Sequence, residues 1–258
     1  MIPVSAQELA FFHHALIAIF ALAGVTLVAL LFITAPYGRH ATRRWGPLLP
    51  GVVAWIVMEL PAAVALPLCC AISPRPLDAA TLALVALWEL HYLHRTFVFP
   101  LRRRRSLHAM PIAIALMGFT FNVFNGWLNG RWLTAIGPLR DVSWLGDPRF
   151  LAGAIVFLCG FGMNVHSDEV LLHLRKPGET GYQIPRGGVY RFVSCPNYLG
   201  EILEWSGFAL AAWSPAGLAF AVYTIANLLP RALAHHRWYR VKFIDYPPER
   251  RAIIPGLL

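Results

Sequence analysis

Charged residues are scarce in this sequence. Asp, Glu, Lys and Arg make up 14% of the 258 residues, whereas 57% are hydrophobic and the mean hydropathy is +0.55. Ordinary soluble domains are about half apolar and about a quarter charged. The shortage of charge therefore excludes an ordinary soluble domain and is typical of a helical protein that crosses a membrane several times.

Cysteine is also sparse, and it forms none of the patterns that hold metals or disulfide frameworks. The sequence contains no CxxC pair, and at least three of its cysteines lie in or beside apolar runs, where a free thiol behaves as a small hydrophobic group. We therefore expect no metal site. The four residues are Cys69, Cys70, Cys159 and Cys195.

The glycine motifs of common nucleotide-binding folds are missing as well. Gly160 and Gly162 lack the third glycine of a dinucleotide fingerprint and follow an apolar run instead of a strand, and no P-loop is present. A nucleotide would have to be held by helix ends and loops. The net charge of +9 could suggest a nucleic-acid partner, but the basic residues cluster between apolar runs, as in cytosolic loops of membrane proteins. We expect no nucleic-acid binding.

Long apolar runs divide the chain into seven segments. A hydrocarbon core of about 30 Å is crossed by roughly 20 helical residues, and Ser214 and Pro215 separate the last two runs in a tight turn. The sequence predicts an all-α, polytopic membrane fold in which residues 1–258 form a single domain of seven transmembrane helices. The predicted spans are 8–35, 48–72, 78–100, 109–130, 149–166, 198–213 and 216–239.

The basic residues predict the orientation of these helices, because Lys and Arg gather in cytosolic loops. The opposite side carries only Arg75, Arg131, Arg140 and Arg149. We therefore expect a cytosolic C-terminus, an N-terminus outside, and a monomer surrounded by membrane lipids, in a bacterial inner membrane or the endoplasmic reticulum. The residues on the predicted cytosolic side include Arg39, Arg43, Arg44, Arg102, Arg103, Arg104, Arg105, Arg175, Lys176, Arg186, Arg191, Arg231, Arg237, Arg240, Lys242, Arg250 and Arg251.

A polar loop at about residues 167–197 interrupts the apolar pattern between the fifth and sixth runs. It is longer than most connections in compact domains, and long ordered loops usually carry a function. On the predicted orientation it lies in the cytosol. We interpret it as a cover for a cofactor.

Glu59 lies in the middle of the second apolar run, in WIVMELPAAVALP. A charged carboxylate there costs roughly 2.5 kcal/mol or more, so intramembrane acids are treated first as functional residues. Apolar surroundings favour the uncharged acid, which donates a hydrogen bond. The alternative is a purely structural hydrogen bond.

Further polar residues gather at the predicted cytosolic ends of the helices. Tyr92 and Arg95 are three residues apart and Asn164 and Asp168 four apart, so each pair shares a helix face. Any one of them could be an interfacial cap, but together they predict a site for a large polar ligand. The other members of this set are Arg175, Tyr182, Asn197, Glu201, His235 and Tyr239.

Three segments carry a resemblance to a known family. The stretch from Asn164 to Trp205, which includes CPNYLGEILEW, resembles the C-terminal signature of the steroid 5α-reductase family, and MELPA and HYLHRTFVFP resemble its two N-terminal landmarks. The match extends from about residue 55 to the C-terminus and suggests a bacterial-type member. CPNYLGE is shared with sterol and long-chain enoyl reductases, so it indicates the cofactor more than the substrate.

The resemblance implies an NADPH-dependent enzyme, a 3-oxo-5α-steroid 4-dehydrogenase. It would saturate the 4,5 double bond of 3-oxo-Δ4 steroids, which would reach it from the bilayer. Glu59 and Tyr92 would hold the 3-oxo oxygen. The resemblance assigns the NADPH pocket to Arg95, Asn164, Asp168, Arg175, Tyr182, Asn197, Glu201, His235 and Tyr239.

One position departs from the family pattern, and several alternatives remain. Met58 stands where relatives often have glutamine before the glutamate of this motif, which removes a polar neighbour of Glu59. Related reductases of sterols or enoyl lipids, and an isoprenylcysteine methyltransferase-like enzyme, share features of the same fold. A di-iron oxygenase would need histidine boxes that the sequence lacks, and a transporter usually shows inverted halves.

Overall fold

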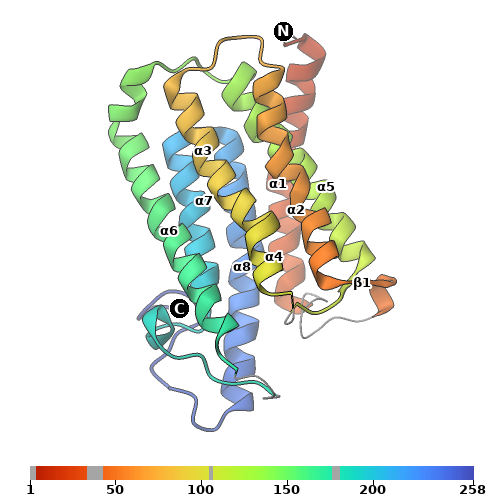
Figure 1. Cartoon of the computed structure of the whole chain (residues 1–258), viewed down its shortest axis with the longest axis vertical. Coiled ribbons are helices and arrows are strands. Elements are labelled where there is room, and N and C mark those ends of the chain that lie inside the picture. Colours follow the sequence, from red (N-terminus) through yellow and green to blue (C-terminus); the bar gives the residue numbers. More distant parts are fainter. Residues whose placement is uncertain (1–3, 34–42, 105–106, 176–180) are drawn as a thin grey trace.

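The computed structural model describes residues 4–33, 43–104, 107–175 and 181–258. Parts of the predicted cytosolic surface, including Arg39, Arg105 and Lys176, lie outside these residues. In the described part of the chain, helices dominate (Figure 1). They are α1 (Ala6–Phe32), α2 (Gly51–Ala71), α3 (Ala79–Leu93), α4 (Phe99–Arg102), α5 (Ile112–Arg131), α6 (Pro148–Leu172), α7 (Pro196–Ala212) and α8 (Pro215–Lys242).

Five helical segments are long and apolar enough to cross a membrane, judged by length and composition within the described residues. They are Ala6–Phe32, Gly51–Ala71, Ile112–Ile136, Pro148–Leu172 and Pro215–Lys242. The predicted third run is helical too, because a π-helical turn at His94–Val98 joins α3 directly to α4. The predicted sixth run corresponds to helix α7, which has 17 residues. The structure thus confirms a mostly helical fold with helices at all seven predicted places.

The connections between helices gather at two ends of the bundle (Figure 1). The end that we call the loop end carries the described residues 43–50, 103–104, 107–111, 173–175, 181–195 and 243–258. The end that we call the turn end carries residues 72–78 and 137–147 together with the start of α1. Two short strands at the loop end, β1 (Leu48–Leu49) and β2 (Met110–Pro111), pair in antiparallel fashion. The predicted tight turn between the last two runs is present, since Trp213 adopts a left-handed conformation and Ser214 caps α8.

The predicted boundaries of the polar loop require one correction. The loop was expected to begin at about residue 167, but α6 continues to Leu172. The extra turns persist because Ser167 and Asp168 are buried against neighbouring helices instead of being exposed to solvent.

Helices α6 and α7 pack closely along a row of glycines. A Cβ atom on Gly153 would overlap the backbone of Ala211, and one on Gly160 would lie 2.5 Å from the carbonyl oxygen of Gly200. Such small residues let two membrane helices approach until their backbones touch. The contact fixes the polar end of α6 against the first turns of α7.

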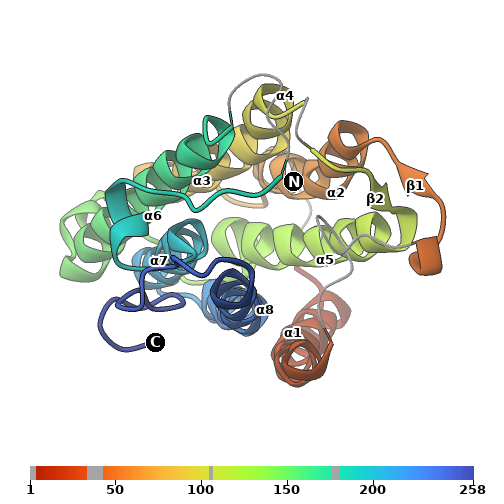
Figure 2. The same cartoon turned by 90° about the horizontal axis from the view of Figure 1, so that it is seen from below.

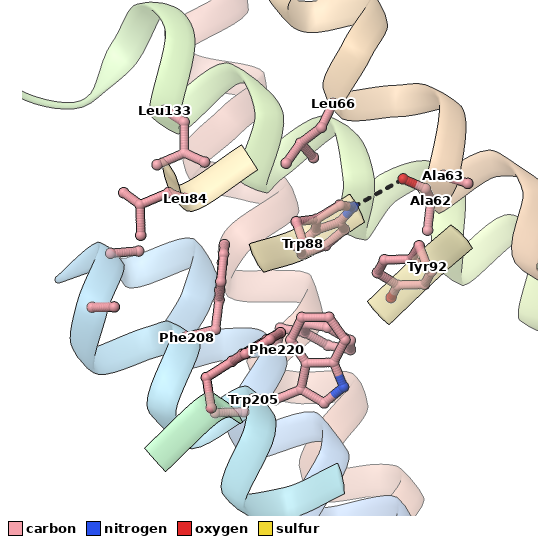
Figure 3. Close-up of a cluster of buried hydrophobic side chains, with 14 of the residues drawn as sticks. Ala62, Ala63, Leu66, Leu84, Trp88, Tyr92, Leu133, Trp205, Phe208 and Phe220 are labelled. Carbon is pink, nitrogen blue, oxygen red and sulfur yellow. Dashed lines mark hydrogen bonds between the residues drawn. The ribbon is translucent and has the colours of Figure 1, made fainter. Parts of the chain in front are cut away.

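Aromatic rings fill the centre of the bundle. The indole rings of Trp88 and Trp205 are 5.3 Å apart, and Phe208 and Phe220 pack against both of them. Figure 3 shows these side chains together, with the hydrogen bond from the Trp88 indole nitrogen to the carbonyl oxygen of Ala62 as a dashed line. This bond sets the register of α3 against α2.

Helix α1 lies at the periphery of the bundle, beside α8 and α5 (Figure 2). Phe12, Ala15 and Ile19 form its buried face, while large apolar side chains cover the rest. At the turn end, Arg131 of α5 contacts Glu8 at 2.6 and 3.1 Å. This ion pair and the buried face hold α1 to the other helices.

Candidate functional site

Glu59 and Tyr92 come to the same level of the bundle because α2 and α3 run in opposite directions. The bond between Trp88 and Ala62 fixes the register, and Glu59 and Tyr92 each lie about one turn further toward the loop end. Both side chains are buried, at 9% and 2% exposure. The structure therefore brings together the two residues predicted to hold the substrate oxygen.

Glu59 has a direct partner that the sequence analysis missed. The amide nitrogen of Asn122 on α5 donates to Glu59 Oε2 at 3.1 Å and to the carbonyl oxygen of Met58 at 2.8 Å. The Met58 side chain packs over Gly118 of the same helix. Asn122 thus provides a polar neighbour for Glu59, while Met58 fills space. A stripe of asparagines at helical spacing, Asn122, Asn125 and Asn129, was the signal in the sequence.

Tyr92 lies among aromatic rings. Its ring centroid is 4.7 Å from that of Trp88, 4.9 Å from that of His91 and 5.5 Å from that of Trp205. The side chain of Asn125 on α5 lies close to its hydroxyl group. The rings fix the phenol in one orientation and keep water away from it.

Arg95 lies at the centre of three acidic side chains contributed by three helices. Its guanidinium nitrogens lie 4.0 Å from Glu59, 3.7 Å from Asp168 and 3.7 Å from Glu201. These distances exceed those of direct hydrogen bonds. The charges attract one another without closing into contact pairs, and this group therefore connects α2, α6 and α7.

The π-helical turn and two aromatic rings position Arg95. The turn at His94–Val98 shifts the residues that follow α3 relative to a regular helix, and such turns occur frequently at functional sites. The guanidinium carbon lies 4.6 Å from the ring centroid of Trp55 and 4.7 Å from that of Phe99. Cation–π contacts of this kind hold the guanidinium in place.

Asn164, Asp168 and Asn197 form a second polar group at the junction of α6 and α7. Asn164 donates to the carbonyl oxygen of Asn197 at 2.9 Å, and the Asn197 amide donates to Asp168 at 3.4 Å. Arg103 lies 3.8 Å from the same aspartate. The close glycine packing of α6 on α7 makes these contacts possible, so the structure brings these three residues together.

His91 and Glu204 form a buried pair outside the predicted set. His91 Nδ1 lies 2.7 Å from Glu204 Oε1, and the two residues are 4% and 0% exposed. The pair joins α3 to α7 beside Tyr92. Its pairing could not be found from the sequence, because the two residues are far apart in the chain and neither marks the other.

Tyr239 and His235 of α8 lie in two neighbouring groups. The hydroxyl of Tyr198 lies 3.3 Å from His235 and accepts a hydrogen bond from Arg231 at 3.0 Å. Tyr239 stacks on Tyr246 of the C-terminal segment, with centroids 5.3 Å apart. Of this set the sequence analysis missed Tyr198, Arg231 and Tyr246.

Arg175 and Tyr182 lie apart from the buried groups. Both are exposed; Arg175 donates to the carbonyl oxygen of Gly181 at 3.4 Å, and the Tyr182 ring contacts that of Trp238. The structure therefore does not bring these two residues into the Arg95 group. Their predicted cofactor role remains a prediction.

A narrow cleft opens beside the site at the loop end. It is partly open to solvent and lies between the π-helical turn with α4 on one side and α6 on the other. Arg102 pairs with Glu169 at 2.8 Å at its edge. Its lining residues are His94, Phe99, Arg102, Arg103, Val165, Asp168, Glu169 and Leu172.

These features define a class of protein: a helical membrane protein with a buried, charged site at one end of its bundle. Residues 108–258 match the family described as 3-oxo-5-alpha-steroid 4-dehydrogenase. The chain is 45% identical over 243 residues to 3-oxo-5-alpha-steroid 4-dehydrogenase 1 of Bos taurus, covering 92% of this chain and 93% of that protein. Over 254 residues it is 40% identical to steroid 5-alpha-reductase DET2 of Gossypium hirsutum, covering 97% and 98%.

The chain belongs to the 3-oxo-5-alpha-steroid 4-dehydrogenase family, as the resemblance predicted. The Homo sapiens 3-oxo-5-alpha-steroid 4-dehydrogenase 1 is also similar, at 44% identity over 224 residues, 86% of this chain and 85% of that protein. Because the similarity to the cotton protein covers 97% of the chain, it includes most of the first 50 residues, where the sequence analysis found no motif.

Proposed function

We propose that this protein uses NADPH to reduce the 4,5 double bond of 3-oxo-Δ4 steroids. The names of its relatives, 3-oxo-5-alpha-steroid 4-dehydrogenase and steroid 5-alpha-reductase, support the reaction and the substrate class. The observation that carries the proposal is the meeting of Glu59 and Tyr92 inside the bundle, next to the Arg95 group.

The proposed reaction places a demand on the 3-oxo oxygen of the steroid. Bound NADPH would supply a hydride to C5, and a proton would then be added at C4. As the hydride arrives, negative charge develops on the 3-oxo oxygen, and donors aimed at that atom stabilise the transition state. On our proposal the Tyr92 hydroxyl and the Glu59 carboxyl donate these hydrogen bonds.

Glu59 can donate only if it carries a proton, and the surrounding charges support this assignment. Two guanidinium groups, Arg95 and Arg103, lie among three carboxyl groups, those of Glu59, Asp168 and Glu201. A buried charge without a counterion is costly, so we infer that one acid stays neutral. Glu59 has the longest contact to Arg95, and its Oε2 already accepts from Asn122, which leaves Oε1 to donate.

Several features of the site fit a nicotinamide dinucleotide. Within the described residues, the buried hydroxyl groups of Thr96 and Ser167 have no hydrogen-bond partner. Amide and carboxyl groups at the start of α7 and the end of α6 match the hydroxyl and carboxamide groups of such a cofactor, and arginines at the loop end match its phosphates. The cleft at the loop end has a cavity volume of only about 20 Å³ and does not accommodate this molecule in the present conformation.

The residues that would hold NADPH fall into two sets on this proposal. Arg95, Asn164, Asp168, Asn197 and Glu201 would bind the part nearest the steroid. Four others, nearer the loop end or in the polar loop, would bind the remainder. They are Arg175, Tyr182, His235 and Tyr239.

We also propose that all seven helical segments cross the membrane, with the loop end in the cytosol. The positions of the basic residues support this orientation. Helix α7, at 17 residues, extends about 25 Å, slightly less than a hydrocarbon core. NADPH would then bind from the cytosol, and the steroid would reach Glu59 from the bilayer.

Incubation of membranes containing this protein with testosterone and NADPH tests the proposed reaction. We expect a product heavier by two hydrogens, detected by mass spectrometry. Tyr92→Phe and Glu59→Ala should each lower turnover on the order of 100-fold, since each removes one donor to the oxygen. Tyr223→Phe is a matched control, because the Tyr223 ring on α8 stacks on Phe121 at a centroid distance of 4.0 Å and belongs to neither of the polar groups described above. Full activity in both site variants would contradict the proposed roles.

A further inference from the structure

The C-terminal segment, residues 243–258, folds back onto the chain that leads into α7. The backbone nitrogens of Ser194 and Cys195 donate to the carbonyl oxygens of Arg251 and Ala252 at 2.8 and 3.1 Å, and Arg251 donates to Phe192 at 3.0 Å. Ile253 is 1% exposed and packs with Cys195 against α8. The segment is therefore an integral part of the loop end.

Ser194 is the centre of this junction. Its hydroxyl oxygen lies 2.6 Å from Tyr246 and 2.6 Å from His236 Nδ1, and it donates to the carbonyl oxygen of Arg251 at 3.2 Å. A serine hydroxyl has one proton to donate and two lone pairs that accept. All three are used if Tyr246 and His236 both donate to Ser194, and such a completely satisfied buried network is rigid.

The same segment contacts two other parts of the candidate site. The buried side chain of Arg250 donates to the carbonyl oxygen of Pro185, near the end of the polar loop, at 3.0 Å. The ring of Tyr246 stacks on that of Tyr239 at an angle of 14°. The C-terminal segment thus joins the polar loop, the start of α7 and the end of α8.

We infer that Ser194, Tyr246 and His236 are positioning residues for cofactor binding. They lock the C-terminal segment against residues 192–195 and so fix residues 185–195 and the start of α7. The inference rests on the proposed NADPH-dependent function and concerns how the residues of that same site are held in place.

The connection to the cofactor groups is short. Asn197 follows Ser194 by three residues, its carbonyl oxygen accepts from Asn164, and its amide reaches Asp168. A shift of the backbone at Ser194 therefore moves Asn197 relative to α6. Glu59 and Tyr92 lie on α2 and α3, which the C-terminal segment does not hold, so steroid binding should be affected little.

A titration of purified protein with NADPH tests this inference. Binding is measured by the quenching of tryptophan fluorescence. Ser194→Ala and Tyr246→Phe should each raise the NADPH Kd about tenfold, the effect of one buried hydrogen bond. The KM for testosterone, and kcat at saturating NADPH, should change less than about twofold. Combining both changes should add little to either one, because the two residues share one network.

Ser73→Ala is the matched control. Ser73 is also buried, and its one hydroxyl proton is shared between the carbonyl oxygens of Arg75 and Thr134, which lie 2.7 and 2.9 Å from its oxygen, but it lies at the turn end. The Ser73→Ala substitution should lower the Tm as much as Ser194→Ala does and leave the NADPH Kd unchanged.

Three results would overturn the inference or the proposal beneath it. An equal rise in NADPH Kd for Ser73→Ala would show a general loss of stability, and an unchanged Kd for Ser194→Ala or Tyr246→Phe would remove the positioning role. Tyr246→Phe retains the ring that stacks on Tyr239, so this variant still tests the positioning role if Ser194→Ala does not fold. Failure of the unmodified protein to bind NADPH would instead contradict the proposed function itself.

Discussion

Arg95 differs from the arginines at the turn end in its distances to acidic partners, although Arg102 near the loop end also forms a close contact, with Glu169. At the turn end, Arg131 lies 2.6 Å from Glu8, and Arg149 lies 2.8 Å from Asp147. Near the loop end, Arg95 lies 3.7 to 4.0 Å from each of three carboxyl groups. The two pairs at the turn end are in direct contact. In the Arg95 group, by contrast, the arginine and the three acids can still form hydrogen bonds to a ligand.

This difference separates charges that hold the fold from charges that are available to a ligand. A closed contact pair joins its two charges directly, and removing one partner affects stability. In the Arg95 group, one cation is shared by α2, α6 and α7 at distances beyond hydrogen bonding. A polar ligand that donates to the acids, or accepts from the arginine, completes these interactions.

The largest expected effect comes from removing the shared cation. Arg95→Met should lower steroid reduction by at least about 100-fold, because it leaves Glu59, Asp168 and Glu201 without their common counterion, a loss of several kcal/mol. The measurement is turnover per folded protein, with folding checked by size-exclusion chromatography in detergent.

Arg140→Met is the control for this change at the turn end. Arg140 is also buried, donates to the carbonyl oxygen of Ala212 and lies over the ring of Trp144. The substitution should lower the Tm while turnover per folded protein stays near that of the unmodified chain. Equal losses of turnover in both variants would remove the distinction between the two ends.

A smaller effect is expected at Asn122, which contacts the acid predicted to bind substrate. Asn122→Ala should lower kcat about tenfold, the effect of one buried hydrogen bond, since Glu59 loses the donor that orients it. Asn129→Ala, two turns further along α5, removes an amide that bonds only to Asn125 in the described residues. A comparable loss of kcat in Asn129→Ala would argue against a specific role for Asn122.

Much of the fold and part of the site could be predicted from the sequence. Apolar runs fixed the positions of the helices, because length and hydropathy are local properties. Glu59, Arg95, Asn164, Asp168 and Asn197 were found as polar residues in or beside such runs, where an unpaired polar group is costly.

The remaining site residues depend on contacts between distant segments. The pairing of His91 with Glu204 and the stacking of Tyr246 on Tyr239 can be predicted only when the arrangement of the helices is known. Glycine contacts, such as that of Gly160 of α6 with the backbone of α7, determine this arrangement. The end of α6 cannot be predicted for the same reason. Its charged residues are typical of a loop as long as the partners that bury them are unknown.

The smallest expected effect concerns Asp147, which caps α6 at the turn end. Hydrogen bonds from the Arg149 side chain and backbone lower the pKa of Asp147 to about 2, below the usual value of about 3.9. A lowered folded-state pKa stabilises the fold above about pH 4, and this contribution is lost as the pH falls toward 2. Asp147→Asn should therefore lower the Tm slightly at pH 7, and the gap to the unmodified protein should narrow by pH 3. Asp245→Asn, at an exposed position, serves as the control, and a Tm gap independent of pH would show that capping geometry, not charge, accounts for the contribution of Asp147.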